Sequence, residues 1–229
     1  MDTTKHETTT LSTLANRLEV LEDKEKVQSL QFKYGYLLDK YYLTEIIQLF
    51  ADHPETEMRF LGGKYKGIAG VTRLLDCRLR PKFANGGNGP VPGQFVDHIQ
   101  LQGVVTIAPD GQRAKGRFRN FQQGAVHNSV DPKPNWPLQQ WWEAGVYENE
   151  YIKIDGIWRF LKVRYQVAWL ADFVKGWKDQ ERHAGMDTRL FPENPVGPDE
   201  YDPEFHTWPE TDTLPFHYPH PVTGEPIAI

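Results

Sequence analysis

Residues 94–126, QFVDHIQLQGVVTIAPDGQRAKGRFRNFQQGAV, contain two long β-forming segments joined by an Asp-Gly turn. Residues 140–170, QWWEAGVYENEYIKIDGIWRFLKVRYQVAWL, repeat the arrangement with a second Asp-Gly pair. Asp-Gly between β-like segments is typical of a hairpin, because tight hairpin turns need residues that tolerate positive φ. The sequence therefore predicts a meander of long antiparallel strands.

The chain before residue 94 is mainly helical in pattern. Apolar residues recur every three or four positions over residues 15–50, which indicates a long helix followed by a short one from Leu43 to Phe50. Residues 57–67 favour a strand and turn, residues 68–80 favour another helix, and residues 81–94 form a Gly/Pro-rich loop. Helices followed by an antiparallel sheet indicate an α+β fold, with the helices packed on one face of a curved sheet.

The sequence divides into three regions. Residues 1–14 are Thr-rich and are expected to be a flexible lead-in, and residues 15–175 form the α+β domain. Residues 176–229 are expected to form an extended arm. Residues 191–229 hold nine of the 17 prolines, with aromatic residues between them, so we expect this tail to pack on its own domain or on a neighbouring subunit.

Composition excludes several classes of protein. The 229 residues carry a net charge of −5 and no basic block, which argues against nucleic-acid binding. No apolar segment is long enough to predict a membrane span, and the first residues have no apolar segment typical of a secretory signal. Cys77 is the only cysteine, so no intrachain disulfide can form, and a reducing cytoplasm is the expected location. Aromatic residues make up 13% of the chain, enough to line a binding pocket for a flat substrate.

Two residues are candidates for proton transfer. Asp39 lies near the end of the first predicted helix, with Gly35 one turn before it. It is either a surface residue or a carboxylate that orients a catalytic group beside space left by Gly35. His98 shares a strand face with Gln100 and Gln102, which is either a solvent-facing polar stripe or the polar part of a pocket.

Basic and aromatic residues on the strands are candidates for substrate contacts. Arg117 and Arg119 share one strand face; facing outward they are solvated, and facing inward they would stabilise a developing oxyanion. Adjacent Trp141 and Trp142 place one indole on each face of the sheet. The predicted substrate-binding residues are Tyr34, Tyr42, Arg117, Arg119, Trp142 and Tyr165.

A stripe of alternating residues in LKVRYQVAW is expected to be mostly core, with Tyr165 and Trp169 near enough to reach a cavity. No metal site is predicted. His217 and His220 lie in a Pro-rich segment with neither helical spacing nor an adjacent Glu. The Gly-rich loops lack the Lys-Ser/Thr pair of a phosphate-binding loop, so we expect no cofactor.

Four segments in this order resemble the SnoaL-like branch of the nuclear-transport-factor-2-like superfamily. They are YGYLLDKYYLTEIIQLFADH (34–53), FLGGKYKGIAGV (60–71), DHIQLQGVVTIAPDGQRAKGRFR (97–119) and GVYENEYIKIDGIWRF (145–160). The resemblance covers about residues 17–172 and implies a cone-shaped barrel whose bent sheet wraps a long helix around a deep pocket.

The same resemblance implies a mechanism. Scytalone dehydratase and dehydrochlorinase-type lyases of this superfamily pair an Asp on the first helix with a His on a strand. The matching residues here are Asp39 and His98. Large members with Pro-rich extensions include lyases that release formaldehyde from lignin-derived diarylpropane diols. The resemblance further implies a homo-oligomer, a dimer or trimer.

We therefore expect a cofactor-independent lyase acting on a small aromatic substrate, by elimination or by retro-aldol loss of formaldehyde. Alternatives are a polyketide cyclase or isomerase, and a non-catalytic module that binds a small molecule or docks a protein. The enzymatic interpretation requires Asp39 and His98 to lie within hydrogen-bond reach at one pocket.

Overall fold

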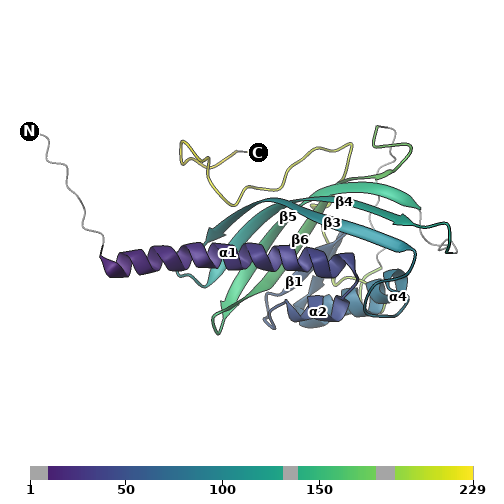
Figure 1. Ribbon diagram of the computed structural model, residues 1–229, viewed down its shortest axis with the longest axis horizontal. Helices are drawn as coiled ribbons and strands as arrows, with labels where there is room; N and C mark the ends of the chain where they lie inside the picture. The colour runs from purple at the N-terminus through teal and green to yellow at the C-terminus, as the bar shows by residue number, and fades with distance from the viewer. Residues whose placement is uncertain (1–9, 131–138, 179–188, 229) are drawn as a thin grey trace, which may run out of the picture.

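The computed structural model describes residues 10–130, 139–178 and 189–228 (Figure 1). The helical elements are α1 (Leu11–Asp39), α2 (Leu43–Gln48), α3 (Gly67–Thr72), a π-helical turn (Arg73–Leu79) and α4 (Arg80–Phe83). The strands are β1 (Glu57–Phe60), β2 (Gly63–Lys66), β3 (Gln94–Ile107), β4 (Arg113–Val126), β5 (Gln140–Ile154), β6 (Ile157–Asp172) and β7 (Glu200–Tyr201).

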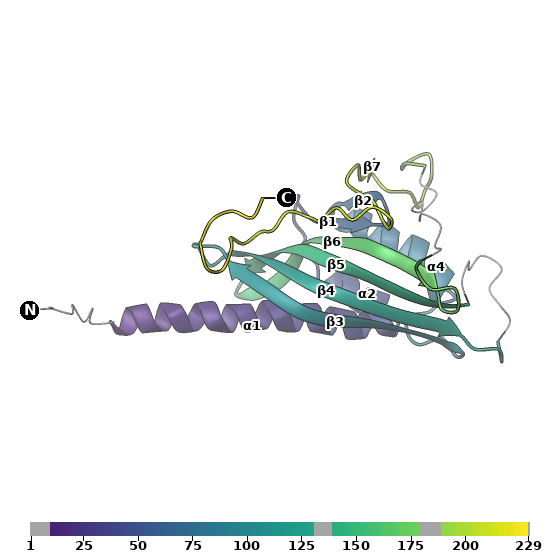
Figure 2. The ribbon, with the colours of Figure 1, turned by 90° about the horizontal axis from the view of Figure 1, so that it is seen from above.

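The strands form one sheet in the order β3-β4-β5-β6-β1-β2-β7. Strands β3 to β6 are the predicted antiparallel meander, and the short β1 joins its far edge in parallel with β6. The sheet is strongly bent but stays open, and the helices pack against it (Figures 1 and 2). The α+β prediction is confirmed.

The second half of α1 is the part that packs on the sheet. Its buried residues recur at helical spacing and line one face of the helix: Asp23, Val27, Gln31, Tyr34 and Gly35. The first turns extend past the sheet (Figure 2), and Leu18 and Leu21 there are exposed although their spacing predicts a buried stripe. The long helix thus carries its C-terminal end, Asp39, to the sheet interior.

One predicted strand face is wrong at its end. The sequence pattern places Trp169 on the same side as Tyr165, but the register of β5 against β6 shifts between Ala144 and Gly145. Beyond this bulge the alternation in β6 changes phase. Trp169 therefore lies on the outer face, where its ring centroid is 6.2 Å from that of Phe121.

The Pro-rich tail crosses the outer face of the sheet (Figure 2). The backbone N–H of Trp208 donates to the carbonyl of Ala168 at 2.7 Å. Farther along, Arg117 donates to the carbonyls of Leu214 and Pro215 at 2.7 and 2.9 Å. The tail is thus attached to the domain by hydrogen bonds, as the sequence analysis expects. None of the helices in the described parts of the chain has the length and apolar character needed to cross a membrane.

Candidate active site

Asp39 and His98 are joined by two hydrogen bonds to one carboxylate oxygen. Asp39 is the last residue of α1, and its Oδ1 lies 3.0 Å from His98 Nδ1 and 2.6 Å from the His98 backbone nitrogen. The two side chains are 14% and 11% exposed. Because the carboxylate accepts the proton on Nδ1, it leaves Nε2 with a lone pair that can accept a proton from another molecule.

Gly35 explains how the helix comes close enough to make this pair. A Cβ at this position would lie 2.9 Å from Gln100 Cγ and 3.2 Å from the His98 carbonyl oxygen. The missing side chain therefore lets α1 lie directly against β3. The expectation of open space beside Gly35 is therefore wrong, because β3 occupies that position.

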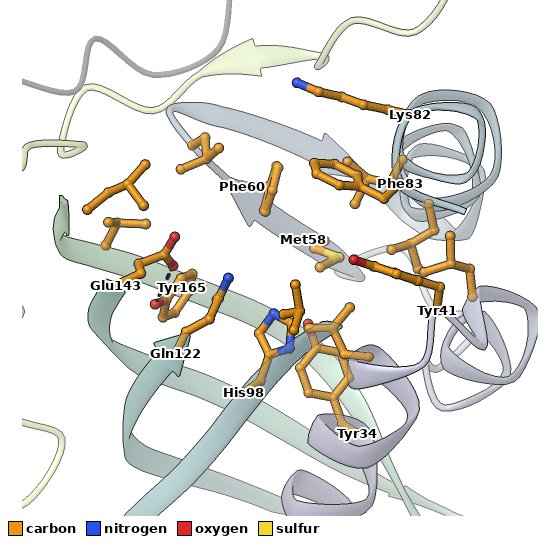
Figure 3. Close-up of a pocket in the computed structure, with 18 of the residues that line it drawn as sticks. Tyr34, Tyr41, Met58, Phe60, Lys82, Phe83, His98, Gln122, Glu143 and Tyr165 are labelled. Atoms are coloured by element: carbon orange, nitrogen blue, oxygen red, sulfur yellow. Dashed lines mark hydrogen bonds between the residues drawn. The ribbon is translucent and has the colours of Figure 1, made fainter. Parts of the chain in front are cut away.

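A row of inward-facing residues runs across the sheet from His98. The strand registers pair His98 with Gln122, Gln122 with Glu143, and Glu143 with Leu170. All four line one cavity, and Figure 3 shows His98, Gln122 and Glu143 side by side. His98 thus begins a row that crosses the strands, in which three polar side chains are followed by Leu170.

The cavity has a volume of about 210 Å³ and a mostly apolar, aromatic wall. The apolar and aromatic residues of the wall include Tyr34, Leu38, Tyr41, Met58, Phe60, Leu75, Leu79, Phe83, Val96, Trp141, Tyr147, Tyr165 and Val167. Small-molecule binding sites usually have this composition, a mostly apolar pocket with a few polar groups. An apolar wall of this kind screens charges less than water does, so it strengthens charge interactions at its surface.

Glu143 is the titratable residue that the sequence analysis missed. Its Oε1 accepts a hydrogen bond from the Tyr165 hydroxyl at 2.7 Å, and Asn120 Nδ2 donates to the same hydroxyl at 2.9 Å. Burial raises the pKa of Glu143 to about 7, and the bond from Tyr165 opposes that rise only in part. The carboxyl is therefore partly protonated at neutral pH.

Two further polar side chains face the cavity. The Tyr41 hydroxyl is buried without a hydrogen-bond partner, and burial raises its pKa to about 12. Tyr41 points into the cavity in Figure 3, so a bound molecule can supply the missing partner. Lys82 lies at the cavity edge, where burial followed by the nearby Arg78 lowers its pKa.

Of the predicted substrate-binding residues, Tyr34 and Tyr165 line this cavity. Tyr42 does not line it, because the chain turns at Tyr41, whose φ is 55°, and Tyr42 becomes the partly exposed residue before α2. Trp141 lines the cavity instead of Trp142, since strand alternation allows only one of them to face inward.

Arg117, Arg119 and Trp142 lie on the outer face. Inward positions of β4 are occupied by buried residues such as Asn120, so the two arginines alternate outward. Arg117 pairs with Glu148 and supports the tail, and Arg119 is exposed. Trp142 stacks on Phe173, with ring centroids 5.3 Å apart, and lies tilted against Phe121 at 5.5 Å. None of the three can contact a molecule inside the cavity.

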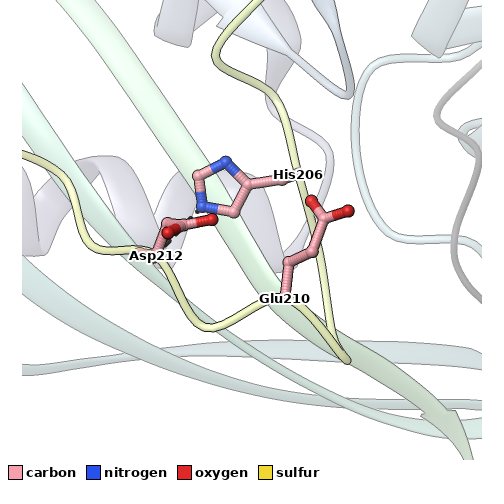
Figure 4. A group of neighbouring side chains, drawn as sticks. All are labelled: His206, Glu210 and Asp212. Atoms are coloured by element: carbon pink, nitrogen blue, oxygen red, sulfur yellow. Dashed lines mark hydrogen bonds between the residues drawn. The ribbon is translucent and has the colours of Figure 1, made fainter.

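Among the residues that the structure describes, one potential metal-ligand group is found, in the tail and outside the cavity (Figure 4). His206, Glu210 and Asp212 bring one ligand atom each within 4.8 Å of one another. The two carboxylates are exposed, and His206 Nε2 lies 3.1 Å from the backbone carbonyl of Asp212. Exposed acidic groups of this kind are usually solvated. His217 and His220 do not belong to this group; His217 pairs with Glu148.

The bent sheet and the long helix packed against it agree with the fold implied by the resemblance to the nuclear-transport-factor-2-like superfamily. The family model described as SnoaL-like domain matches residues 19–164. The chain therefore belongs to the SnoaL-like family.

Solved structures support the fold. A scytalone dehydratase candidate from Novosphingobium aromaticivorans is 16% identical, with a TM-score of 0.54, over 75% of this chain and 97% of the other. A type 2 hexachlorocyclohexane dehydrochlorinase is 20% identical, with a TM-score of 0.52, over 68% and 91%. The type 3 enzyme from Novosphingobium barchaimii is 19% identical, with a TM-score of 0.52, over 68% and 92%. None of the curated proteins compared with this chain matches it significantly.

Proposed function

We propose that the protein is a cofactor-independent lyase that acts on a small aromatic substrate by acid–base chemistry. The observation that carries the proposal is the His98 ring, held through Nδ1 by Asp39 at the wall of an aromatic cavity. A neutral imidazole fixed in this tautomer is a suitable general base. The similar structures are named as a dehydratase and as dehydrochlorinases, and enzymes of both kinds are lyases.

Two reactions use this base in the same way. In an elimination, His98 Nε2 removes a proton from carbon, the C–H electrons form a double bond, and a group leaves the neighbouring carbon. In a retro-aldol-type loss of formaldehyde from a 1,3-diol, Nε2 removes the proton of the CH₂OH hydroxyl, and the O–H electrons form the C=O bond of formaldehyde. The electron pair of the broken C–C bond forms a C=C bond, and the hydroxyl on the neighbouring carbon leaves as water once it is protonated. In both, Asp39 stabilises the imidazolium that forms. We propose lignin-derived aromatic diols as the substrates of the second reaction.

The test is turnover of two probes. A 1,2-diarylpropane-1,3-diol reports formaldehyde release, and 4-hydroxy-4-phenylbutan-2-one reports water loss by formation of the conjugated enone. We expect turnover of at least one, abolished in His98→Gln and kept in the matched control His127→Gln, whose exposed ring lies outside the cavity. Turnover should persist in the presence of a chelator. Binding of both probes without any product would instead support a binding module.

A further inference from the structure

We infer that Glu143 is a second catalytic residue, the general acid that protonates the departing oxygen of the substrate while His98 acts as the base. The inference rests on the proposed lyase function and adds to it a substrate class. The substrates would be compounds with a poor leaving group, such as a hydroxyl, which departs readily only when it is protonated.

Position is the first support. His98 and Glu143 lie in the same transverse row, two strands apart, with Gln122 between them. With strands spaced by about 4.8 Å, their Cα atoms are about 10 Å apart, and both side chains project into the cavity (Figure 3). A substrate lying over Gln122 can therefore present a C–H to one group and a neighbouring C–O to the other.

The direction of the hydrogen bonds is the second support. Gln31 Nε2 donates to Gln100 Oε1 at 2.8 Å, and Gln100 Nε2 donates to Asn120 Oδ1 at 3.2 Å. Asn120 must then use Nδ2 to donate to Tyr165, so the Tyr165 hydroxyl proton points to Glu143 Oε1. Oε1 is thus an acceptor, and the carboxyl proton is carried by Oε2.

Figure 3 shows the second oxygen of Glu143 directed away from Tyr165, on the cavity side. A proton on this oxygen is available to a bound molecule. Burial favours the protonated form near neutral pH. The other titratable groups that line the cavity are Tyr34, Tyr41, Lys82, His98, Tyr147 and Tyr165. Of these, Tyr165 contacts the carboxyl directly, through Oε1.

The step balances without any further reactant. His98 Nε2 takes a proton from carbon, and the C–H electron pair forms the new C=C bond. The C–O bond breaks, and its electron pair accepts the proton from Glu143 Oε2, so water leaves. The enzyme is left with a protonated His98 and an ionised Glu143, and a proton passes from one to the other through solvent before the next turnover.

The test compares two leaving groups on one carbon skeleton. The probes are 4-hydroxy-4-phenylbutan-2-one and its acetate ester, which both give the same enone. Acetate needs no full protonation to leave, whereas hydroxide does. We expect Glu143→Gln to lower kcat about 10²-fold on the alcohol, a typical loss for a general acid, and only a few-fold on the acetate. The matched control is Glu150→Gln, on the same strand but outside the cavity.

The outcomes separate this inference from the proposed function. Equal losses on both probes in Glu143→Gln would overturn the role of Glu143 and leave His98 as the base. Unchanged rates on both probes in His98→Gln would instead overturn the proposed function. An infrared difference spectrum of the parent minus Glu143→Gln gives a readout free of turnover. A protonated carboxyl band at pH 6 is expected, and its absence would overturn the inference even where neither probe reacts.

Discussion

Replacing Glu143 by Gln should make the protein more stable at alkaline pH. The carboxyl lies against Tyr165 on the wall of an apolar cavity, and burial raises its pKa from 4.5 to about 7. Glutamine has the same shape and can still accept the Tyr165 hydrogen bond through its carbonyl oxygen. Glutamine has no charge to bury. The substitution therefore removes the contribution of residue 143 to the change of the free energy of unfolding with pH, and little else.

The sign and size of the effect follow from linkage. Between pH 4.5 and about 7 the folded parent holds a proton that the unfolded chain has released, so its free energy of unfolding falls as pH rises. Raising the pKa of the Glu143 carboxyl from 4.5 to about 7 corresponds to about 3 kcal/mol of folding free energy, reached in full above pH 7. The Glu143→Gln variant lacks this loss. Its melting temperature relative to the parent should therefore rise by about 6–12 °C between pH 4.5 and pH 8.

The assay is differential scanning calorimetry of the parent and the variant at both pH values. Taking the difference between the two proteins cancels the titration of all other groups. His98 lines the same cavity as Glu143, so the comparison is repeated in a His98→Gln background, which has no imidazole there. A stability difference between parent and variant that does not change with pH would mean that Glu143 titrates normally, which would refute the argument.

Three other predictions address the dyad, the helix contact and the tail. His98→Ala and Asp39→Asn should each lower turnover by about 10²- to 10⁴-fold with unchanged far-ultraviolet circular dichroism; near-normal rates would return both residues to a structural role. Gly35→Ala should lower turnover and stability together, because the new Cβ meets Gln100 Cγ at 2.9 Å and pushes the helix from the sheet; a crystal structure of the variant with an unchanged Asp39–His98 distance would contradict this. Removing residues 191–229 should lower the melting temperature and weaken the expected assembly; calorimetry and light scattering giving the parent's values would show that the tail contributes to neither.

The elements with local signals could be predicted from the sequence. Two Asp-Gly pairs give the hairpins β3–β4 and β5–β6, and helical spacing gives α1 up to Asp39. These features depend on turn chemistry and periodicity, which lie within short segments of chain. The pairing of Asp39 with His98 came from the family resemblance, because no local pattern connects residues 59 positions apart.

The sequence predicted less reliably which face of the sheet each side chain occupies. Arg117 and Arg119 alternate on a strand, and a strand alone does not reveal which of its faces meets the helix. The tail decides the environment of Arg117, since its guanidinium donates to the Leu214 and Pro215 carbonyls. These residues are almost 100 positions apart in the sequence, and no pattern within either segment predicts that they meet.

Glu143 was missed because its position depends on register between strands. Three pairings must hold at once for His98, Gln122, Glu143 and Leu170 to form one row. Bulges interrupt the pairing of β3 with β4 and of β5 with β6, and a slip of one residue would turn the row to the outer face. Periodicity within one strand contains no information about these slips.

The location of Glu143 in the cavity wall also supports the proposal that it donates a proton to a bound molecule. With a pKa of about 7, an ionised Glu143 carboxyl is expected to cost about 3 kcal/mol of folding stability above pH 7. Leu170, the next residue in the row, lines the same cavity with an apolar side chain, which carries no such cost. A half-buried carboxyl with a raised pKa, facing a cavity opposite a fixed imidazole, is the arrangement expected where a proton must be given to a bound molecule. The leaving-group comparison and the calorimetric comparison therefore test the same carboxyl by independent means.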